Sequence, residues 1–80
     1  MDNCWTVYIL ECADNTFYTG ITTNLERRLK EHESGKGAKY TRGRGPLRVV
    51  YTEGAVSRSE ASKREAEIKS MDKAAKLELL

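Results

Sequence analysis

The sequence predicts a small α+β protein in which a three-stranded, mainly antiparallel sheet is flanked by helices. Three short runs rich in β-branched and aromatic residues predict strands at 5–12, 17–21 and 47–52. Helix-capping signals precede the other long segments of the chain, which are therefore predicted to be helices. The resulting order, β-β-α-β-α-α, is typical of one sheet covered by helices, and 80 residues leave room for a single domain, residues 1–80.

The first two predicted strands form a hairpin whose turn lies at 13–16, and two registers are open. A two-residue loop sends Tyr8 and Tyr18 to opposite faces of the sheet, because successive strand residues alternate between faces. A three-residue loop puts both tyrosines on one face and places Tyr8 opposite Gly20, which leaves space above the sheet. We favour the three-residue loop because Asn15 tolerates the left-handed backbone conformation that its last position requires.

A capping box that begins at Thr23 predicts a helix at about 24–34. At about 100° per residue, Arg28 and His32 lie on the only apolar stripe of this helix, and Arg27 lies on the opposite face. A charged side chain on a core-facing stripe is costly unless it is paired or hydrated. We therefore select Arg28 and His32, and not Arg27, as functional candidates.

A second capping box, which begins at Ser57, predicts a helix that runs to about Ser70, and Asp72 caps a short helix through Leu80. Glu65 falls inside the apolar stripe of the longer helix, whereas the other glutamates of that helix point away from it. A carboxylate in that position can bind a cation or pair with a cation of the first helix. The alternative is a buried ion pair without chemistry.

The net charge of +2 hides a strongly basic segment at 27–48, where eight cations stand against two carboxylates. Such a patch favours a polyanionic partner, although a solvated charged face is the alternative. Within it, the glycine-rich loop at 35–46 offers cations for backbone phosphates and one tyrosine for stacking on a base. These candidate nucleic-acid-binding residues are Lys36, Lys39, Tyr40, Arg42 and Arg44.

Two negative observations narrow the class of protein. No apolar run approaches the roughly 20 residues of a membrane span, and the N-terminus lacks the features of a secretory signal, so we expect a cytoplasmic protein without a membrane partner. Cys4 and Cys12 lie too far apart along one predicted strand to form a disulfide, and we expect both to be free thiols.

Taken together, these motifs resemble the GIY-YIG nuclease superfamily, and most closely its small stand-alone bacterial proteins. The first family motif stands here as Thr6-Val7-Tyr8 and the second as Tyr18-Thr19-Gly20. The helix motif reads N-L-E-R-R-L-K-E-H from Asn24 to His32, and A-S-K-R-E-A-E-I-K runs from Ala61 to Lys69. Each motif is weak alone, but their order and spacing over most of the chain are specific.

The resemblance implies a catalytic site made of Tyr8, Tyr18, Arg28, His32 and Glu65. In this assignment Arg28 binds phosphate, and Glu65 binds Mg²⁺ or another divalent cation. We expect Tyr8 to take a proton from the attacking water, with its pKa lowered by nearby cations and His32 relaying the proton. Tyr18 orients the phosphate. Where excision-repair members carry a lysine after the second motif, this chain has Ile21, which removes one cation from the site.

The leading hypothesis is a metal-dependent endonuclease that hydrolyses phosphodiester bonds of nucleic acid, with DNA favoured. One alternative is a nucleic-acid-binding module with the same fold and little or no catalysis, acting in DNA repair or recombination. A protein-interaction domain that does not bind nucleic acid is a third. A weak homodimer, or a partner protein that supplies substrate specificity, would compensate for the small size and the missing accessory DNA-binding domain.

Overall fold

Three strands form one antiparallel sheet at the centre of the protein, for which a computed structural model describes residues 4–37, 41 and 43–80. The strands are β1 (Trp5–Glu11), β2 (Phe17–Thr22) and β3 (Arg48–Ala55). Their order in the sheet is β2-β1-β3, so that β1 pairs with both neighbours. The predicted antiparallel sheet is therefore confirmed.

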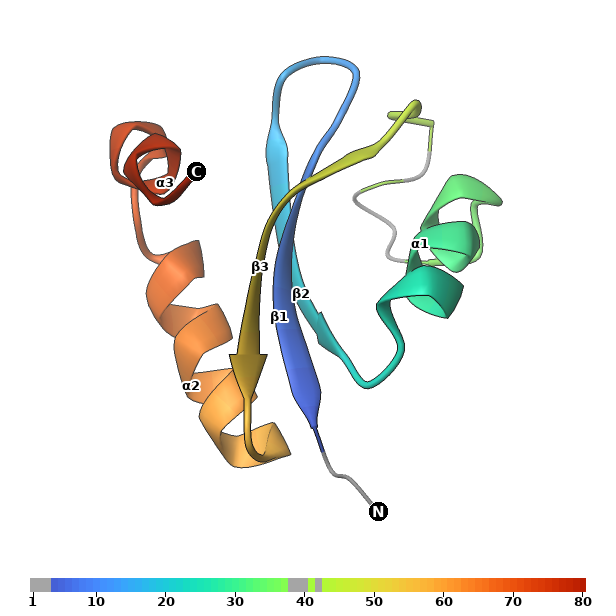
Figure 1. Ribbon diagram of the computed structural model, residues 1–80. Helices are drawn as coiled ribbons and strands as arrows, with labels where there is room; N and C mark the ends of the chain where they lie inside the picture. The colour runs from blue at the N-terminus through green and yellow to red at the C-terminus, as the bar shows by residue number, and fades with distance from the viewer. Residues whose placement is uncertain (1–3, 38–40, 42) are drawn as a thin grey trace.

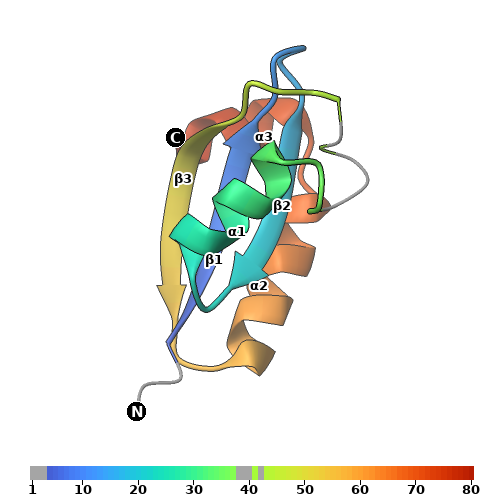
Figure 2. The same cartoon turned by 90° about the vertical axis from the view of Figure 1, so that its right-hand side faces the viewer.

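Helices cover both faces of this sheet (Figure 1). Helix α1 (Leu25–Glu33) lies on one face, and α2 (Arg58–Lys69) lies on the other together with the short α3 (Lys73–Leu79). Seen from the side of α1, helix α2 passes behind the sheet and reaches the edge formed by β2 (Figure 2). The element order β-β-α-β-α-α and the α+β class match the prediction.

The hairpin between β1 and β2 has the three-residue register. Tyr8 pairs with Gly20 and Leu10 pairs with Tyr18, so both tyrosines point to the face covered by α1. Asn15 has a φ of 66°, the left-handed conformation expected at the last loop position. The strand pairing thus confirms the three-residue loop, and the backbone of Asn15 agrees with it.

The helix caps agree with the sequence except at α1. Ser57 and Asp72 cap α2 and α3 as predicted, because each side chain accepts a hydrogen bond from the backbone N–H three residues on. Helix α1 begins one residue later than its capping box suggests. Its cap is Asn24, whose side chain accepts from the Arg27 N–H at 3.0 Å, while Thr22 Oγ1 accepts from the Asn24 N–H at 3.1 Å.

Strand β3 is longer than predicted, since it continues to Ala55 rather than ending at Thr52. Glu53, Gly54 and Ala55 have low intrinsic strand propensity, but they pair with the central strand β1. Backbone pairing therefore outweighs local propensity here.

Among the described residues, no helix is both long and apolar enough to cross a membrane. Both cysteines are free, with Cys4 exposed and Cys12 buried.

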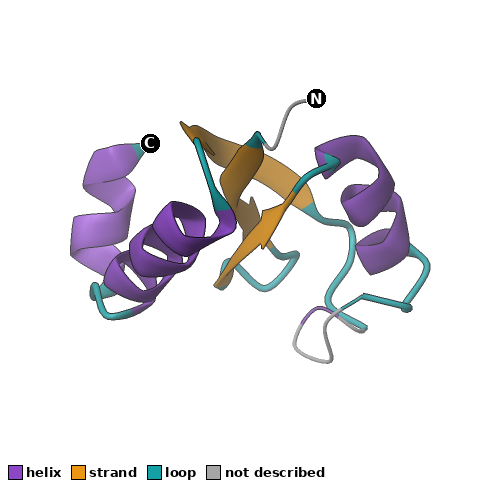
Figure 3. Cartoon of the chain, turned by 90° about the horizontal axis from the view of Figure 1, so that it is seen from below, coloured by secondary structure: helices purple, strands orange, loops and turns teal. Residues whose placement is uncertain are grey.

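Alternate residues of β1 build two separate cores, one on each face of the sheet. Val7 and Ile9 pack with Ala61 and Ile68 of α2, and all four side chains are completely buried. On the opposite face, Tyr8, Leu10, Cys12 and Leu47 form the second core, against which Leu25 and Leu29 of α1 pack. Seen from below, the sheet separates the two groups of helices (Figure 3).

Candidate active site

Three buried polar side chains, linked by hydrogen bonds, lie between α1 and the sheet. The Tyr8 hydroxyl contacts His32 Nε2 at 2.9 Å, and His32 Nδ1 contacts Thr41 Oγ1 at 2.9 Å. Tyr8 and His32 are each 1% exposed and Thr41 is 2% exposed. Because the imidazole has one partner on each ring nitrogen, its orientation is fixed. A proton can pass between Tyr8 and His32 without any rearrangement.

Tyr18 borders this chain on the same face of the sheet. Its ring centroid lies 5.2 Å from that of His32, with the two planes inclined by 62°, and 6.4 Å from that of Tyr8. These spacings are those of favourable tilted aromatic contacts. The three rings therefore support one another, and Tyr18 is the most exposed of them.

Two glycines make room for these rings. A Cβ atom on Gly20, opposite Tyr8, would lie 2.5 Å from the Tyr8 hydroxyl oxygen, and a Cβ on Gly37 would lie 2.5 Å from His32 Nδ1. Both distances are far shorter than any van der Waals contact. The space above Gly20 that the sequence predicts is therefore filled by the phenol of Tyr8. Gly37 lets the loop after α1 close over His32.

Arg28 lies at the border between this buried chain and solvent. Its Nη1 pairs with Glu31 Oε1 at 2.9 Å, its side chain is 32% exposed, and the guanidinium is close enough to the Tyr8 hydroxyl to lower the pKa of the phenol. Arg27 is exposed, as the helical-face argument predicts. A guanidinium has five N–H donors, so the pair with Glu31 leaves donors for a phosphate.

Electrostatics set the protonation states of Tyr8 and His32. Burial raises the pKa of Tyr8 to about 12, and this outweighs the opposing effect of Arg28. Burial, and to a lesser extent the positive charge of Arg28, lowers the pKa of His32. At neutral pH the site thus holds a neutral phenol beside a neutral imidazole. Desolvation by burial is the largest effect on Tyr8, so the pKa of the phenol ends above its usual value although Arg28 lowers it as expected of a nearby cation.

Glu65 reaches the same region from α2, at the β2 edge of the sheet. Its negative charge acts on Tyr8, raising the pKa of the phenol. Glu65 Oε2 pairs with Lys69 Nζ at 3.1 Å, and the Lys69 ammonium lies 6.0 Å from the centroid of the Tyr18 ring. The Glu65 side chain is 23% exposed, whereas Glu60 and Glu67 on the same helix are exposed. Of these three glutamates Glu65 is thus the least exposed, as the helical-face argument predicts.

The donor set around Glu65 fits one kind of metal ion. Within the described residues, no three His, Cys, Asp or Glu side chains lie close enough together to hold a metal. A zinc site of three or four protein ligands therefore does not match this region. Mg²⁺ is commonly bound by one or two carboxylates and keeps several waters, so Glu65 as a single protein ligand fits that ion.

The basic loop is only partly described. Lys36 is exposed at the end of α1, and Arg44 Nη1 pairs with Asp14 Oδ2 at the tip of the hairpin, so this cation is engaged within the protein. The other loop residues selected from the sequence lie outside the described residues. They are Lys39, Tyr40 and Arg42.

Sequence reasoning missed two residues of this region. Thr41 lies outside the predicted helices and strands, so no periodic pattern reveals its contact with His32, which depends on the path of the loop. Lys69 does carry a signal, since it follows Glu65 by one helical turn and can therefore reach it. Lys69 thus brings a cation next to Tyr18 and Glu65 from α2, whereas Ile21 packs against the apolar core.

Comparison with known proteins gives the class of this chain. The family model described as "GIY-YIG catalytic domain" matches residues 4–78. The chain therefore belongs to the GIY-YIG family, which is a family of nucleases, and the resemblance noted in the sequence is confirmed.

Its relatives are small proteins of similar length. The chain is 58% identical over 74 residues to a UPF0213 protein of Natronomonas pharaonis, covering 92% of this chain and 87% of the relative. It is 52% identical over 80 residues to a UPF0213 protein of Oceanobacillus iheyensis, covering 100% and 93%. Among solved structures, the solution structure of UPF0213 protein BH0048 from Bacillus halodurans matches with a TM-score of 0.61 at 53% identity. That match covers 95% of this chain and 81% of the other.

Proposed function

We propose that the protein is a metal-dependent endonuclease that hydrolyses phosphodiester bonds in nucleic acid, with DNA the favoured substrate. The observation that carries this proposal is the hydrogen-bonded chain Tyr8–His32–Thr41 beside the partly exposed Arg28. A proton relay that ends next to an anion-binding guanidinium is suited to activating water against a phosphate.

Tyr8 and His32 act together as the base. A phenol with a pKa of about 12 is protonated at neutral pH and cannot accept a second proton by itself. It can accept the proton of the attacking water only as its own proton passes to His32 Nε2, 2.9 Å away. The lowered pKa of His32 keeps the imidazole neutral and therefore able to accept. Thr41 accepts from Nδ1–H in this tautomer and holds the ring in place.

The phosphate is held by Arg28 and oriented by Tyr18. The guanidinium donates to the non-bridging oxygens, which carry the charge that grows during the reaction. Glu65 would hold a divalent cation, which would supply further positive charge next to the phosphate. Lys69 Nζ pairs with Glu65 Oε2, so a cation held by this carboxylate would share it with the ammonium or displace the ammonium.

Glu65→Gln tests the assignment of the metal ligand. Single-stranded, branched and duplex DNA, and the corresponding RNA, are incubated with the purified protein with and without Mg²⁺. We expect cleavage by the wild type with Mg²⁺ and a loss of at least about 100-fold in the variant, because a carboxamide is a poor ligand for this ion. Glu67→Gln, two residues along the same helix but exposed, is the matched control and should cleave normally.

Two further measurements complete this test. Mg²⁺ titration followed by NMR should shift the Glu65 signals in the wild type, a readout that does not require turnover. Arg28→Ala should lose far more activity than Arg27→Ala, since only Arg28 faces the site. Equal losses for the two arginines, or undiminished cleavage by the Glu65 variant, would contradict the proposed roles.

A second candidate is a nucleic-acid-binding module with little or no catalysis. The observation that favours it is the Glu65–Lys69 pair, because an ion pair already satisfies the carboxylate that the metal requires. This alternative predicts that nucleic acid binds equally well in EDTA and that no product appears with any of the substrates when Mg²⁺ is added.

A further inference from the structure

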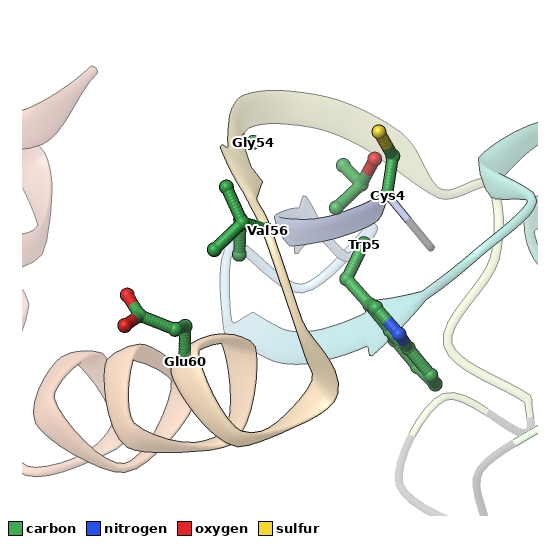
Figure 4. A pocket seen from close by; sticks show the side chains of 7 residues that line it. Cys4, Trp5, Gly54, Val56 and Glu60 are labelled. Carbon is green, nitrogen blue, oxygen red and sulfur yellow. The ribbon is translucent and has the colours of Figure 1, made fainter. Parts of the chain in front are cut away.

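Three hollows on the described surface differ in charge. The first, of about 420 Å³, lies between Cys4 and Trp5 on one side and Val56 and Glu60 on the other, and its one charged residue is acidic (Figure 4). The second contains a cation and a carboxylate that pair with each other, Arg48 with Glu11. The third, of about 220 Å³, is lined by two lysines and no carboxylate. Of these three, only the third attracts a polyanion.

The third hollow is the end of a row of lysines that begins at the candidate active site. We call Lys69, Lys73 and Lys76 the lysine row. The Lys69 ammonium lies over the ring of Tyr18, and the Lys73 ammonium lies 5.7 Å from the centroid of the neighbouring ring of Phe17. Lys76 lines the hollow together with Lys73 and Phe17. The row therefore runs along the β2 edge, from the site toward the tip of the hairpin.

The outer part of the lysine row is not neutralised. Lys69 pairs with Glu65, but neither Lys73 nor Lys76 has a carboxylate within ion-pair distance in the described part of the chain. Lys73 Nζ donates instead to the backbone carbonyl of Asn15 at 3.1 Å. The nearby Asp72 caps α3 and accepts from the Ala75 N–H. Two ammonium groups beside an aromatic ring are thus available to an anionic ligand.

We infer that the lysine row and Phe17 bind the single strand of nucleic acid that flanks the scissile phosphate. Lys73 and Lys76 contact backbone phosphates, and a base lies in the hollow against Phe17. Cationic side chains that follow the backbone, together with an aromatic surface for a base, are the usual means of holding a single strand. This inference rests on the proposed function, and it places the strand along α2 and α3 rather than across the loop that contains Arg44, which pairs with Asp14.

The test compares two double variants that remove the same charge. Lys73→Ala/Lys76→Ala removes the outer row, and Arg58→Ala/Lys63→Ala removes two exposed cations of α2. Binding of a fluorescent oligonucleotide of about 12 nucleotides, as DNA and as RNA, is measured by anisotropy in EDTA between about 50 and about 200 mM salt. Because no metal is present, binding is measured whether or not the protein cleaves.

We expect the row variant to bind about ten-fold more weakly and its salt slope to fall by about 1.4, since each phosphate contact on a single strand contributes about 0.7. The control should change neither quantity appreciably. An unchanged slope in the row variant, or equal weakening in both variants, overturns the inference even if the wild type is a nuclease. Conversely, a selective loss of binding without any cleavage by the wild type supports the lysine row and contradicts the proposed catalysis.

Discussion

The two faces of the sheet receive side chains from the same strand, but one face is an apolar core and the other contains buried polar rings. Val7 and Ile9 of β1 point toward α2 and are packed in an apolar core, whereas Tyr8, between them in sequence, points toward α1 and meets His32. Helix α2 approaches the strands more closely than α1 does, as the wider spacing on the α1 side of Figure 1 also shows. The small side chain of Ala61 allows the closer approach, while large polar rings fill the wider space.

We therefore expect the α2 face to contribute mainly to stability and the α1 face mainly to the proposed activity. Burying apolar side chains on the α2 face stabilises the fold by about 25 cal/mol for each Å² removed from water. Burying Tyr8, His32 and Thr41 on the α1 face is tolerable only because each of them has a hydrogen-bond partner. Mutations on one face should therefore act mainly on stability, and those on the other mainly on activity.

Tyr8→Phe should give the largest effect on activity. The substitution keeps the ring but removes the hydroxyl that we propose takes the water proton, so we expect cleavage to fall by about 10²–10⁴-fold. It also leaves His32 Nε2 without the Tyr8 partner, which should cost about 1–3 kcal/mol of stability. Single-turnover cleavage and urea unfolding of the same preparation measure both quantities. A variant that cleaves at the wild-type rate would remove Tyr8 from the mechanism.

Ile68→Ala should have the opposite profile. The side chain is completely buried against Val7 and Ile9, and truncation in such a core costs about 2–5 kcal/mol. Activity per folded molecule should stay close to that of the wild type, because the side chain lies on the far face of the sheet from His32. Urea unfolding gives the loss, and cleavage at a temperature where the variant remains folded gives the activity. A large loss of activity in folded protein would show that the two faces are coupled.

The same contrast explains which parts of the structure could be predicted from the sequence. Periodicity placed Arg28 and His32 on an inner face and Arg27 outside, because the angular positions on a helix follow from spacing alone. The hairpin register depended on a turn residue, Asn15, that has a recognisable conformational preference. These features depend only on residues that are close together in the chain, so the sequence alone is enough to predict them.

Other features depend on contacts that no local pattern contains. Thr41 meets His32 only through the path of the loop after α1. The pKa of Tyr8 could not be inferred from nearby cations, because it depends on how deeply the fold buries the phenol. The place of Lys69 beside Tyr18 depends on how α2 packs along the β2 edge, which the pattern of the strand alone does not contain.

Thr19→Val should sharpen the comparison by improving the apolar face. Thr19 pairs with Ile9 and is 2% exposed, and its hydroxyl has no hydrogen-bond partner among the described residues. Replacing this hydroxyl by a methyl group of similar size should raise the free energy of unfolding by about 1 kcal/mol, because an unsatisfied buried donor is removed. The increase is measured by urea unfolding, and cleavage should be unchanged. A loss of stability would mean that the hydroxyl has a partner in the native protein.

The smallest effect is a change of stability with pH that originates at His32 on the α1 face. Burial lowers the pKa of His32 in the folded protein, so below about pH 6.5 the unfolded chain binds a proton that the folded protein does not. Stability should therefore fall as the pH drops below about 6.5, the usual pKa of histidine, and His32 should contribute nothing to the slope well above that pH. Asp14 and Glu31 have lowered pKa values and titrate at still lower pH. Urea unfolding of the wild type and of His32→Gln at several pH values isolates the effect, because the variant should lose the slope in this window. A slope that persists in His32→Gln would assign the titration to another group and would leave the imidazole without the shift that the proposed relay uses.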